Sequence, residues 1–387
     1  MDNFAGYKRG VLIFEFDPEN WLFYLFMVYG LSVLVQLGYT WILLSRFAFY
    51  KPPSSDPGSQ PVSVVICAKD EYHNLKRNLP FVLEQDYPDF EVVVVNDASD
   101  DETEELLKDL AREYERLKPV TISQNLNFFK GKKFPLSLGI KSAKHDLILL
   151  TDADCRPESP QWIARMTSAF GEDREIVLGY GRYEMKSGVL NRIIRYETLI
   201  TALQYFSYAL AGLPYMGVGR NLAYRKSLFY KNKGFISHYR IHSGDDDLFV
   251  NRVAHKGNTA IEVHPGSITV SRPKSGFGDW WRQKKRHIST AKHYRPLHKT
   301  LLWIYNFTQM MTWAGIILLI ILSYNIIFAL SLFAIRLISQ LVILHGAMVR
   351  LNEKKLLLIS PLMDLFLSAL YPVLGFSNWM RKPDKWK

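Results

Sequence analysis

The sequence predicts an α/β domain with a mainly parallel sheet, flanked by apolar helices that are long enough to cross a membrane. Three observations support this fold class. Strand-like and helix-like stretches alternate between residues 60 and 155, as in parallel sheets that are covered on both faces. Residues 21–45 contain no charged side chain, and residues 300–349 contain one, Arg336. Segments of this length and composition can span a lipid bilayer.

The first element along the chain is the uncharged segment 21–45. It is longer than the apolar part of a signal peptide and lacks a small-residue cleavage site, so it predicts a transmembrane helix. Asp17 and Glu19 precede this segment, whereas Arg46 and Lys51 follow it. Because positive charge marks the cytoplasmic side of a span, we expect the central part of the chain to be cytoplasmic.

A linker rich in Pro, Ser and Gly, residues 51–61, leads into the alternating region. Each predicted strand is a nearly continuous apolar run, and the longer predicted helices carry apolar side chains at helical spacing. In chain order the predicted elements are strand 62–68, a helix reaching Leu83, strand 90–97, helix 102–115, strand 119–123, a short helix after Gly131 and strand 146–154.

Acidic side chains follow the ends of these strands. Glu71 comes shortly after Ala68, Asp97 ends the second strand, and Asp152 and Asp154 end the last one. In an open parallel sheet all these ends lie at one edge, where ligands bind. Carboxylates gathered there repel one another unless a cation lies among them, and the sequence has no GxGxxG or GxxxxGK[ST] phosphate loop. This pattern favours a divalent cation that holds a diphosphate.

Three consecutive aspartates, Asp245–Asp247, precede an apolar helical pattern that begins at Leu248. A carboxylate in this position could take the proton of an acceptor hydroxyl, or it could cap the helix. Three acids in a row exceed what a cap requires, which favours catalysis. A purely structural alternative also exists for Asp152 and Asp154, which could simply shape a turn.

The charge balance restricts the class of partner. The chain has 48 Lys and Arg against 37 Asp and Glu, a net charge of +11, which favours anionic partners. The excess lies beside the apolar segments instead of along a solvated stripe, so we expect no nucleic-acid partner. Cys67 and Cys155 are too few for a disulfide framework and indicate a reduced, cytosolic domain.

The C-terminal part begins with a basic segment, 276–299, which carries seven Lys and Arg, one acid and the pair Trp280–Trp281. This composition is typical of an interfacial helix, and we expect Trp280 and most of the lysines to face lipid. The next apolar region, up to residue 349, has room for two spans joined by a tight turn near Ser323–Asn325.

Charged and helix-breaking residues interrupt the last two apolar segments. Arg336 is costly to bury in a bilayer, so it indicates an interhelical contact or an aqueous or lipid-headgroup path. Segment 356–376 contains Pro361, Asp364 and Pro372, and a basic tail follows it. Because that tail conflicts with a simple crossing, we expect this segment to be re-entrant, interfacial or tilted.

Several of these stretches, in this order, resemble the inverting family 2 glycosyltransferases, which have the GT-A nucleotide-sugar fold. The opening strand and nucleotide loop of the family resemble VSVVICAKDEYHNL, the uracil-contacting segment resembles VVVVNDASDDET, and the Gly-Lys element resembles FFKGKKFPLSLGIKSAKHD. The metal motif is similar to DAD (152–154), the acceptor-side strand to GVGRNLAYRKSLF, and the base segment to SGDDDLFVNRV. QKKRH (283–287) stands where membrane-integrated members have Gln-x-x-Arg-Trp, with His287 in place of Trp.

The resemblance implies roles for individual residues. Asp245 would be the catalytic base, with Asp246 as the alternative, whereas Asp247 would be structural. Asp152 and Asp154 would hold Mg²⁺ or Mn²⁺. The donor-nucleotide-binding residues would be Ala68, Glu71, Asp97, Gly131, Lys132, Asp152, Gln283 and Arg286.

The resemblance also implies a function. We expect transfer of a sugar from a UDP-sugar donor to a carbohydrate hydroxyl in polysaccharide synthesis, by a protein of the bacterial inner membrane that contacts membrane lipid. A lipid or lipid-linked acceptor is the first alternative, and a non-catalytic membrane scaffold is the second. The expected domains are 1–50 with the first transmembrane helix, 51–275 as a cytoplasmic GT-A domain, 276–299 as the basic interfacial helix, and 300–387 as the C-terminal transmembrane helices and tail.

Overall fold

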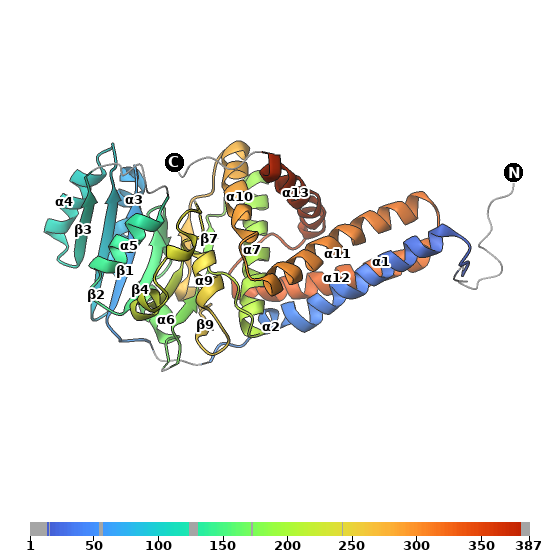
Figure 1. Ribbon diagram of the computed structural model, residues 1–387, viewed down its shortest axis with the longest axis horizontal. Coiled ribbons are helices and arrows are strands. Elements are labelled where there is room, and N and C mark those ends of the chain that lie inside the picture. Colours follow the sequence, from blue (N-terminus) through green and yellow to red (C-terminus); the bar gives the residue numbers. More distant parts are fainter. Residues whose placement is uncertain are drawn as a thin grey trace.

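The computed structural model describes residue 14 and residues 16–53, 57–123, 131–171, 173–241 and 243–380. Figure 1 shows an elongated molecule, with an α/β domain at one end and a bundle of long helices at the other. Helices α7 (Val189–Leu210) and α10 (Phe277–Ala291) stand between these two parts.

A seven-stranded mixed sheet forms the centre of the α/β domain, in the order β3-β2-β1-β4-β8-β6-β9. The first four strands in this order are parallel, β8 is antiparallel to both of its neighbours, and β9 is parallel to β6. The predicted strands 62–68 and 90–97 are confirmed with these bounds. The strands are β1 (Val62–Ala68), β2 (Phe90–Asp97), β3 (Leu117–Ile122), β4 (Leu147–Asp152), β6 (Ile176–Leu178), β8 (Leu222–Arg225) and β9 (Thr259–Ile261).

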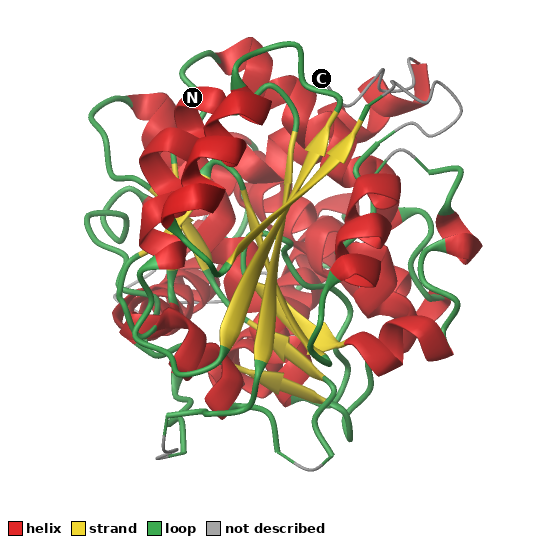
Figure 2. Ribbon diagram, turned by 90° about the vertical axis from the view of Figure 1, so that its left-hand side faces the viewer, coloured by secondary structure: helices red, strands yellow, loops and turns green. Residues whose placement is uncertain are grey.

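Both faces of this sheet are covered, which explains the uninterrupted apolar strands. Along β1, Val65 and Cys67 pack in the same cluster as α5, whereas Ile66 packs with α3 on the opposite face. Successive strand residues point to opposite faces, so each of them must be apolar. Figure 2 shows the twisted strands between the helices. One face is covered by α3 (Tyr72–Leu83), α4 (Thr103–Glu113) and α6 (Trp162–Ser168), and the other by α5 (Lys133–Ser142), α7, α8 (Lys226–Lys231) and α9 (Asp247–Val253).

Helix α5 approaches the sheet closely at Gly139. A Cβ atom at this position would lie 2.6 Å from Val65 Cγ1 and 2.9 Å from Val95 Cγ2, so a larger residue would push the helix outward. Glycine therefore holds α5, and the two lysines at its start, close to β1 and β2.

A second sheet of three strands, β5-β10-β7, begins directly after β4. Its strands are β5 (Cys155–Pro157), β7 (Gly181–Tyr183) and β10 (Thr269–Ser271). Cys155 is opposite Ser271, and Ser271 is opposite Tyr183. These three side chains therefore form one row across the small sheet. Two single turns of 3₁₀ helix, η2 (Ile236–His238) and η3 (Pro265–Ser267), complete the domain.

Helix α10 contains the basic segment, but its side chains are not arranged as predicted. Trp280 is fully buried, and Lys284 forms a buried ion pair with Glu197 of α7. The prediction that Trp280 and most lysines face lipid is therefore wrong for Trp280 and Lys284. The reason is that α10 packs against both α7 and the last helix of the bundle, α13 (Ser360–Met380). The helix in the basic segment also ends earlier than the predicted residue 299. It ends at Ala291, and a new helix begins at Pro296.

The bundle contains the long apolar helices. Four helices in the described part of the chain are long and apolar enough to cross a membrane, which indicates an integral membrane protein. The predicted turn between two spans is confirmed, and Ser323 (φ 53°) and Asn325 (φ 44°) have left-handed backbone conformations there. The first helix is α1 (Trp21–Gly38), which continues through the π-helical segment η1 (Tyr39–Leu44) into α2 (Ser45–Ala48), and the next two are α11 (Pro296–Ile321) and α12 (Ile326–Arg350).

A buried ion pair explains the two charges in the last apolar segments. Arg336 Nη1 of α12 lies 2.9 Å from Asp364 Oδ2 of α13. Gln309 Nε2 and Trp313 Nε1 of α11 donate to the same carboxylate at 2.6 and 2.8 Å. The prediction of an interhelical contact at Arg336 is confirmed. Helix α13 lies at an angle to the bundle in Figure 1, with its C-terminal end beside α10.

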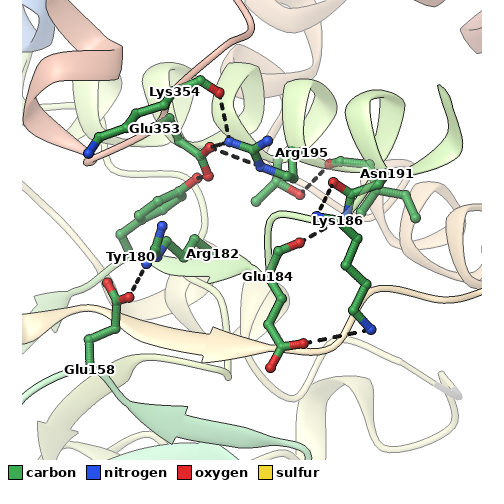
Figure 3. Close-up of polar contacts among 11 residues, drawn as sticks. Glu158, Tyr180, Arg182, Glu184, Lys186, Asn191, Arg195, Glu353 and Lys354 are labelled. Carbon is green, nitrogen blue, oxygen red and sulfur yellow. Dashed lines mark hydrogen bonds and ion pairs between the residues drawn. The ribbon is translucent and has the colours of Figure 1, made fainter. Parts of the chain in front are cut away.

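A third buried ion pair joins the bundle to the α/β domain (Figure 3). Arg195 of α7 donates to Glu353, in the turn between α12 and α13, through Nε at 3.1 Å and through Nη2. The Tyr180 hydroxyl donates to the same carboxylate at 3.2 Å, and Arg195 Nη2 also donates to the Lys354 carbonyl at 2.9 Å. The side chains of Arg195 and Glu353 are 3% and 0% exposed. This turn of the bundle therefore belongs to the interior of the α/β domain.

Candidate active site

The carboxyl ends of β1, β2 and β4 lie at one edge of the large sheet, as the sequence predicts. Cys67 of β1 is opposite Asp152 of β4, and Ala68 is paired with the end of β2. Asp97, the last residue of β2, is half-buried at the same edge. Burial raises the pKa of Asp97, although the charge of Lys69 opposes this shift. The edge therefore gathers carboxylates that are partly removed from water.

Two further residues from the sequence analysis stand before helices at this edge. Glu71 precedes α3, accepts a hydrogen bond from Asn74 Nδ2 at 2.5 Å, and lies within electrostatic reach of Asp154. Gly131 has φ 99°, a conformation that glycine adopts easily and other residues rarely adopt. It therefore allows the sharp turn into α5. The first three residues of the Gly-Lys element, 128–130, lie outside the described residues.

Asp152, Asp154 and Cys155 present two carboxylates and a thiol whose ligand atoms all lie within 4.8 Å of one another. Cys155 Sγ is 3.4 Å from Asp154 Oδ1. Burial and the neighbouring Asp152 raise the pKa of Asp154. A divalent cation at this position would stabilise both ionised carboxylates. The two carboxylates are ligands of the kind that Mg²⁺ and Mn²⁺ prefer, so the donor set fits such an ion.

Lys132 connects the two acidic groups of the candidate site. Its Nζ contacts Asp152 Oδ1. Burial alone would lower the pKa of Lys132, but the charges of Asp152 and Asp245 raise it well above its usual range. Burial likewise favours a raised pKa for Asp152, but Lys132 lowers it below its usual range. Asp245 therefore lies within electrostatic reach of the lysine that contacts Asp152.

Arg220 is a residue of this site that sequence reasoning missed. Its guanidinium lies 4.2 Å from the centroid of the Tyr183 ring, and Nη1 donates to Ser271 Oγ at 2.9 Å. Burial raises the pKa of Asp154, and the charge of Arg220 opposes that effect. A sequence signal existed, because Arg220 lies in the Gly-Val-Gly-Arg-Asn stretch that the resemblance assigned as a whole to the acceptor side.

The second and third of the consecutive aspartates make structural contacts. Asp246 caps α9 and accepts hydrogen bonds from the backbone N–H groups of Gly219 and Asp247, each at 2.7 Å. Asp247 is buried and accepts from the Tyr294 hydroxyl at 2.7 Å and from Thr290 Oγ1. The capping alternative therefore describes Asp246, and Asp247 has a structural role as well.

Asp245 has a different environment from its two neighbours. Its carboxylate is half-buried and accepts no hydrogen bond from any residue that the structure describes. Burial, together with the charges of Asp245 and Asp247, raises the pKa of Asp246 to about 7. Of the three carboxylates, that of Asp245 is therefore the one left available to a ligand.

Helix α10 brings Gln283 and Arg286 to the same edge. Gln283 Nε2 lies 3.5 Å from the Tyr183 hydroxyl. The charge of Arg286 adds to that of Lys132 in opposing the effect of burial on the Asp152 pKa. His287, which stands at the position of the family Trp, is exposed. The site therefore draws on the sheet edge, α5, the segment before α9, and α10.

Comparisons with known proteins bear on the fold and on the sequence of the α/β domain. A profile described as "Glycosyl transferase family 2" matches residues 63–233, which run from β1 to the end of α8. The mannosyltransferase PcManGT from Pyrobaculum calidifontis, solved with GDP-Man and Mn²⁺, aligns with a TM-score of 0.58 and 19% identity, over 85% of this chain and 97% of that one. At this identity the likeness shows the fold.

Several curated relatives are similar in sequence. A poly-beta-1,6-N-acetyl-D-glucosamine synthase of Staphylococcus epidermidis is 27% identical over 273 residues, 66% of this chain and 63% of the relative. The probable glycosyltransferase YdaM of Bacillus subtilis is 27% identical over 58% of this chain and 54% of its own length. A poly-beta-1,6-N-acetyl-D-glucosamine synthase of Staphylococcus aureus is 25% identical over 77% of this chain and 74% of the relative. The chain thus spans less than two thirds of the first two of these relatives.

The mixed sheet, its covering helices and the acidic edge give an α/β domain with a GT-A-like fold, carried on long apolar helices. Residues 63–233 are similar to glycosyl transferase family 2, and the chain is similar in sequence to the poly-β-1,6-N-acetyl-D-glucosamine synthases.

Proposed function

We propose that this chain is a membrane-embedded, inverting N-acetylglucosaminyltransferase that uses UDP-N-acetylglucosamine in polysaccharide synthesis. The observation that carries the proposal is the grouping of carboxylates near Lys132: its Nζ contacts Asp152, which clusters with Asp154, and Asp245 lies within its electrostatic reach. The relatives that are named poly-β-1,6-N-acetyl-D-glucosamine synthases support the choice of sugar and product.

In the proposed reaction, Asp245 acts as the general base. It accepts the proton of an acceptor hydroxyl while the oxygen of that hydroxyl forms a bond to the anomeric carbon of the donor sugar. The bond between that carbon and the diphosphate oxygen breaks on the opposite face, and its electron pair leaves with UDP. The configuration at the anomeric carbon is therefore inverted. Asp245 is favoured as the base because its carboxylate accepts no hydrogen bond from the described residues. Asp246 is the alternative, because its carboxylate already accepts two backbone hydrogen bonds.

The leaving diphosphate needs positive charge around it. Asp152 and Asp154 would hold Mg²⁺ or Mn²⁺, which would stabilise the charge that develops on the diphosphate. Lys132 of α5, together with Gln283 and Arg286 of α10, would donate hydrogen bonds to the same group. The remaining nucleotide-binding residues of the proposal, at the ends of β1 and β2 and before α3 and α5, are Ala68, Glu71, Asp97 and Gly131.

Enzymatic turnover provides the direct test. The detergent-purified full chain should release UDP from UDP-N-acetylglucosamine in the presence of Mg²⁺ or Mn²⁺, and the product should contain repeated N-acetylhexosamine units. UDP-glucose and UDP-galactose serve as donor controls. A product that extracts into organic solvent would instead indicate a lipid-linked acceptor. If the chain neither binds UDP in a metal-dependent manner nor releases it from any UDP-sugar, the proposal is wrong and a scaffold becomes the better interpretation.

We also propose that the α/β domain, residues 51–275, lies on the cytoplasmic side of the bacterial inner membrane. Arg46 and Lys51 on the domain side of the first helix support this orientation. A Ser59→Cys variant tests it, because Ser59 is exposed in the linker while Cys67 and Cys155 are buried. The new thiol should resist an impermeant reagent in intact cells and react after lysis. Labelling in intact cells would reverse the orientation.

A further inference from the structure

Lys133, the residue after Lys132, makes contacts that the proposed mechanism does not use. It begins α5 and is 3% exposed. Its Nζ donates hydrogen bonds to the Ser243 carbonyl at 2.6 Å and to the Ile241 carbonyl. Ser243 lies two residues before Asp245. Lys133 therefore fastens the start of the segment 243–247, here called the base segment, to the helix that also begins beside Asp152.

The other end of the base segment is fastened to α10. Asp247 accepts hydrogen bonds from Thr290 Oγ1 and, at 2.7 Å, from the Tyr294 hydroxyl. Thr290 is in the last turn of α10, and Tyr294 lies in the turn that follows. All three side chains are buried. Asp245 thus lies between two anchored residues. Ser243 before it is held by Lys133, and Asp247 after it is held by Thr290 and Tyr294.

The chemistry of Lys133 argues for a positioning role over space filling. A buried ammonium group is costly to desolvate, whereas an apolar side chain of the same length would fill the space without that cost. Burial lowers the pKa of Lys133, and the carboxylates of Asp245, Asp247 and Asp246 oppose this. The buried charge therefore has a use: it donates hydrogen bonds to two carbonyl oxygens in the segment just before the proposed base.

We propose that Lys133 and Asp247 are positioning residues. They hold the base segment at both ends, an arrangement here called the clamp, and so place the Asp245 carboxylate. The clamp rests on the proposed function, because it assigns Lys133 and Asp247 a part in placing its base. The two helices that hold the base segment also carry the donor residues, since Lys132 adjoins Lys133 on α5 and α10 carries Gln283 and Arg286. The segment that carries the base is therefore attached to the same two helices that carry the proposed diphosphate-binding residues. This attachment fixes the distance between the base and those residues.

A Lys133→Met substitution tests the first anchor. Met has a similar length and no hydrogen-bond donor, so the base segment should lose its hold while the site stays filled. We expect kcat for UDP-sugar turnover to fall by about 100-fold, the loss that a misplaced catalytic group produces. The KM for the UDP-sugar and the affinity for UDP should stay unchanged. The variant should still unfold well above the assay temperature, although the two carbonyls that lose their donor should lower its melting temperature by a few degrees. Lys141→Met, an exposed lysine on the same helix, is the matched control and should behave as wild type.

A Tyr294→Phe substitution tests the second anchor, with the exposed Tyr230→Phe as its control. We expect Tyr294→Phe to lower kcat with little change in KM. The double variant should lose less than the product of the two single losses, because both anchors position the same carboxylate.

The outcomes separate the clamp from the proposed function. If the wild-type chain turns over its donor and Lys133→Met retains full kcat, only the clamp is refuted. If Lys133→Met loses UDP binding together with kcat and unfolds near the assay temperature, Lys133 is merely structural and the clamp is again refuted. If the wild-type chain turns over no UDP-sugar, the proposed function and the clamp fail together.

Discussion

The acidic edge of the sheet and the junction between domain and bundle both bury charge, but they balance it differently. At the edge, Asp152 has Lys132 as its partner, while burial and Asp152 leave the Asp154 carboxyl with a raised pKa. At the junction, burial raises the pKa of Glu353 as well, but Arg195 and the Tyr180 hydroxyl both donate hydrogen bonds to its carboxylate and oppose that shift. Unbalanced buried charge indicates a binding site, whereas balanced charge indicates a packing contact. Activity and stability should therefore respond to different substitutions in these two regions.

The largest effect should come from Asp154→Asn. We expect loss of metal-dependent turnover with no loss of thermal stability, because the substitution removes a repulsive charge beside Asp152. UDP release and the melting temperature, measured on the same preparation, check this. Asp109→Asn, on the exposed surface of α4, is the control. Full turnover in the Asp154 variant, or in the wild type under exhaustive chelation, would remove the metal from the proposal.

The base substitution should have the next largest effect. Asp245→Asn should lower kcat by roughly two to four orders of magnitude, while UDP and metal binding persist. Asp246→Ala is the matched comparison, since it should cost about 1 kcal/mol of stability through loss of the helix cap and retain turnover. Turnover and thermal unfolding of both variants distinguish the two roles. If Asp246→Ala is inactive and Asp245→Asn is active, Asp246 is the base.

At the junction, the expected effect is on stability. Glu353→Gln removes one partner of a buried pair and should destabilise the chain by about 3–5 kcal/mol, as measured by unfolding in detergent. Glu104→Gln, which breaks an exposed pair with Lys108 on α4, is the control and should change stability little. An Arg195→Met, Glu353→Met double variant should regain much of the loss. If the double variant is as unstable as the single one, charge balance does not explain the junction.

The smallest effect is a pH dependence that arises at Asp246. In the folded chain this residue keeps its proton up to about pH 7, whereas an unfolded aspartate releases it near pH 3.9, roughly its reference pKa. The folded state therefore binds more protons between these values, and the stability from this group is lost as the pH rises through that range. Melting temperatures from about pH 4 to pH 7 should fall less in Asp246→Asn than in wild type. Parallel curves would contradict the assignment.

The sequence predicted which carboxylates gather at the edge of the sheet, because their placement follows from a local rule. Parallel strands place their carboxyl ends at one edge, so Asp97 and Asp152 could be brought together from the strand pattern alone. Arg220 could not be found in this way, because β8 enters the sheet antiparallel between β4 and β6. Its neighbours depend on strands that are far away in the sequence.

The side chains around α10 show the same limit. An amphipathic pattern shows that one face of a helix is apolar, but it does not show what covers that face. The pattern predicts that Trp280 faces lipid, yet Trp280 is buried in a cluster that also contains side chains of α7 and α13. The contacts of Lys133 and Asp247 likewise join elements that are 43 to 110 residues apart, so no local pattern predicts them.

The pair between Arg195 and Glu353 also has a consequence for biosynthesis. Its partners are 158 residues apart in the chain, and at about 5–20 residues per second the ribosome needs roughly 8–30 seconds to make the second after the first. During this interval the core of the α/β domain contains an arginine without its carboxylate, which is costly to bury. The domain can therefore complete its interior only after α11 and α12 have been synthesised. Correct membrane insertion of that hairpin thus becomes a condition for a completely folded α/β domain.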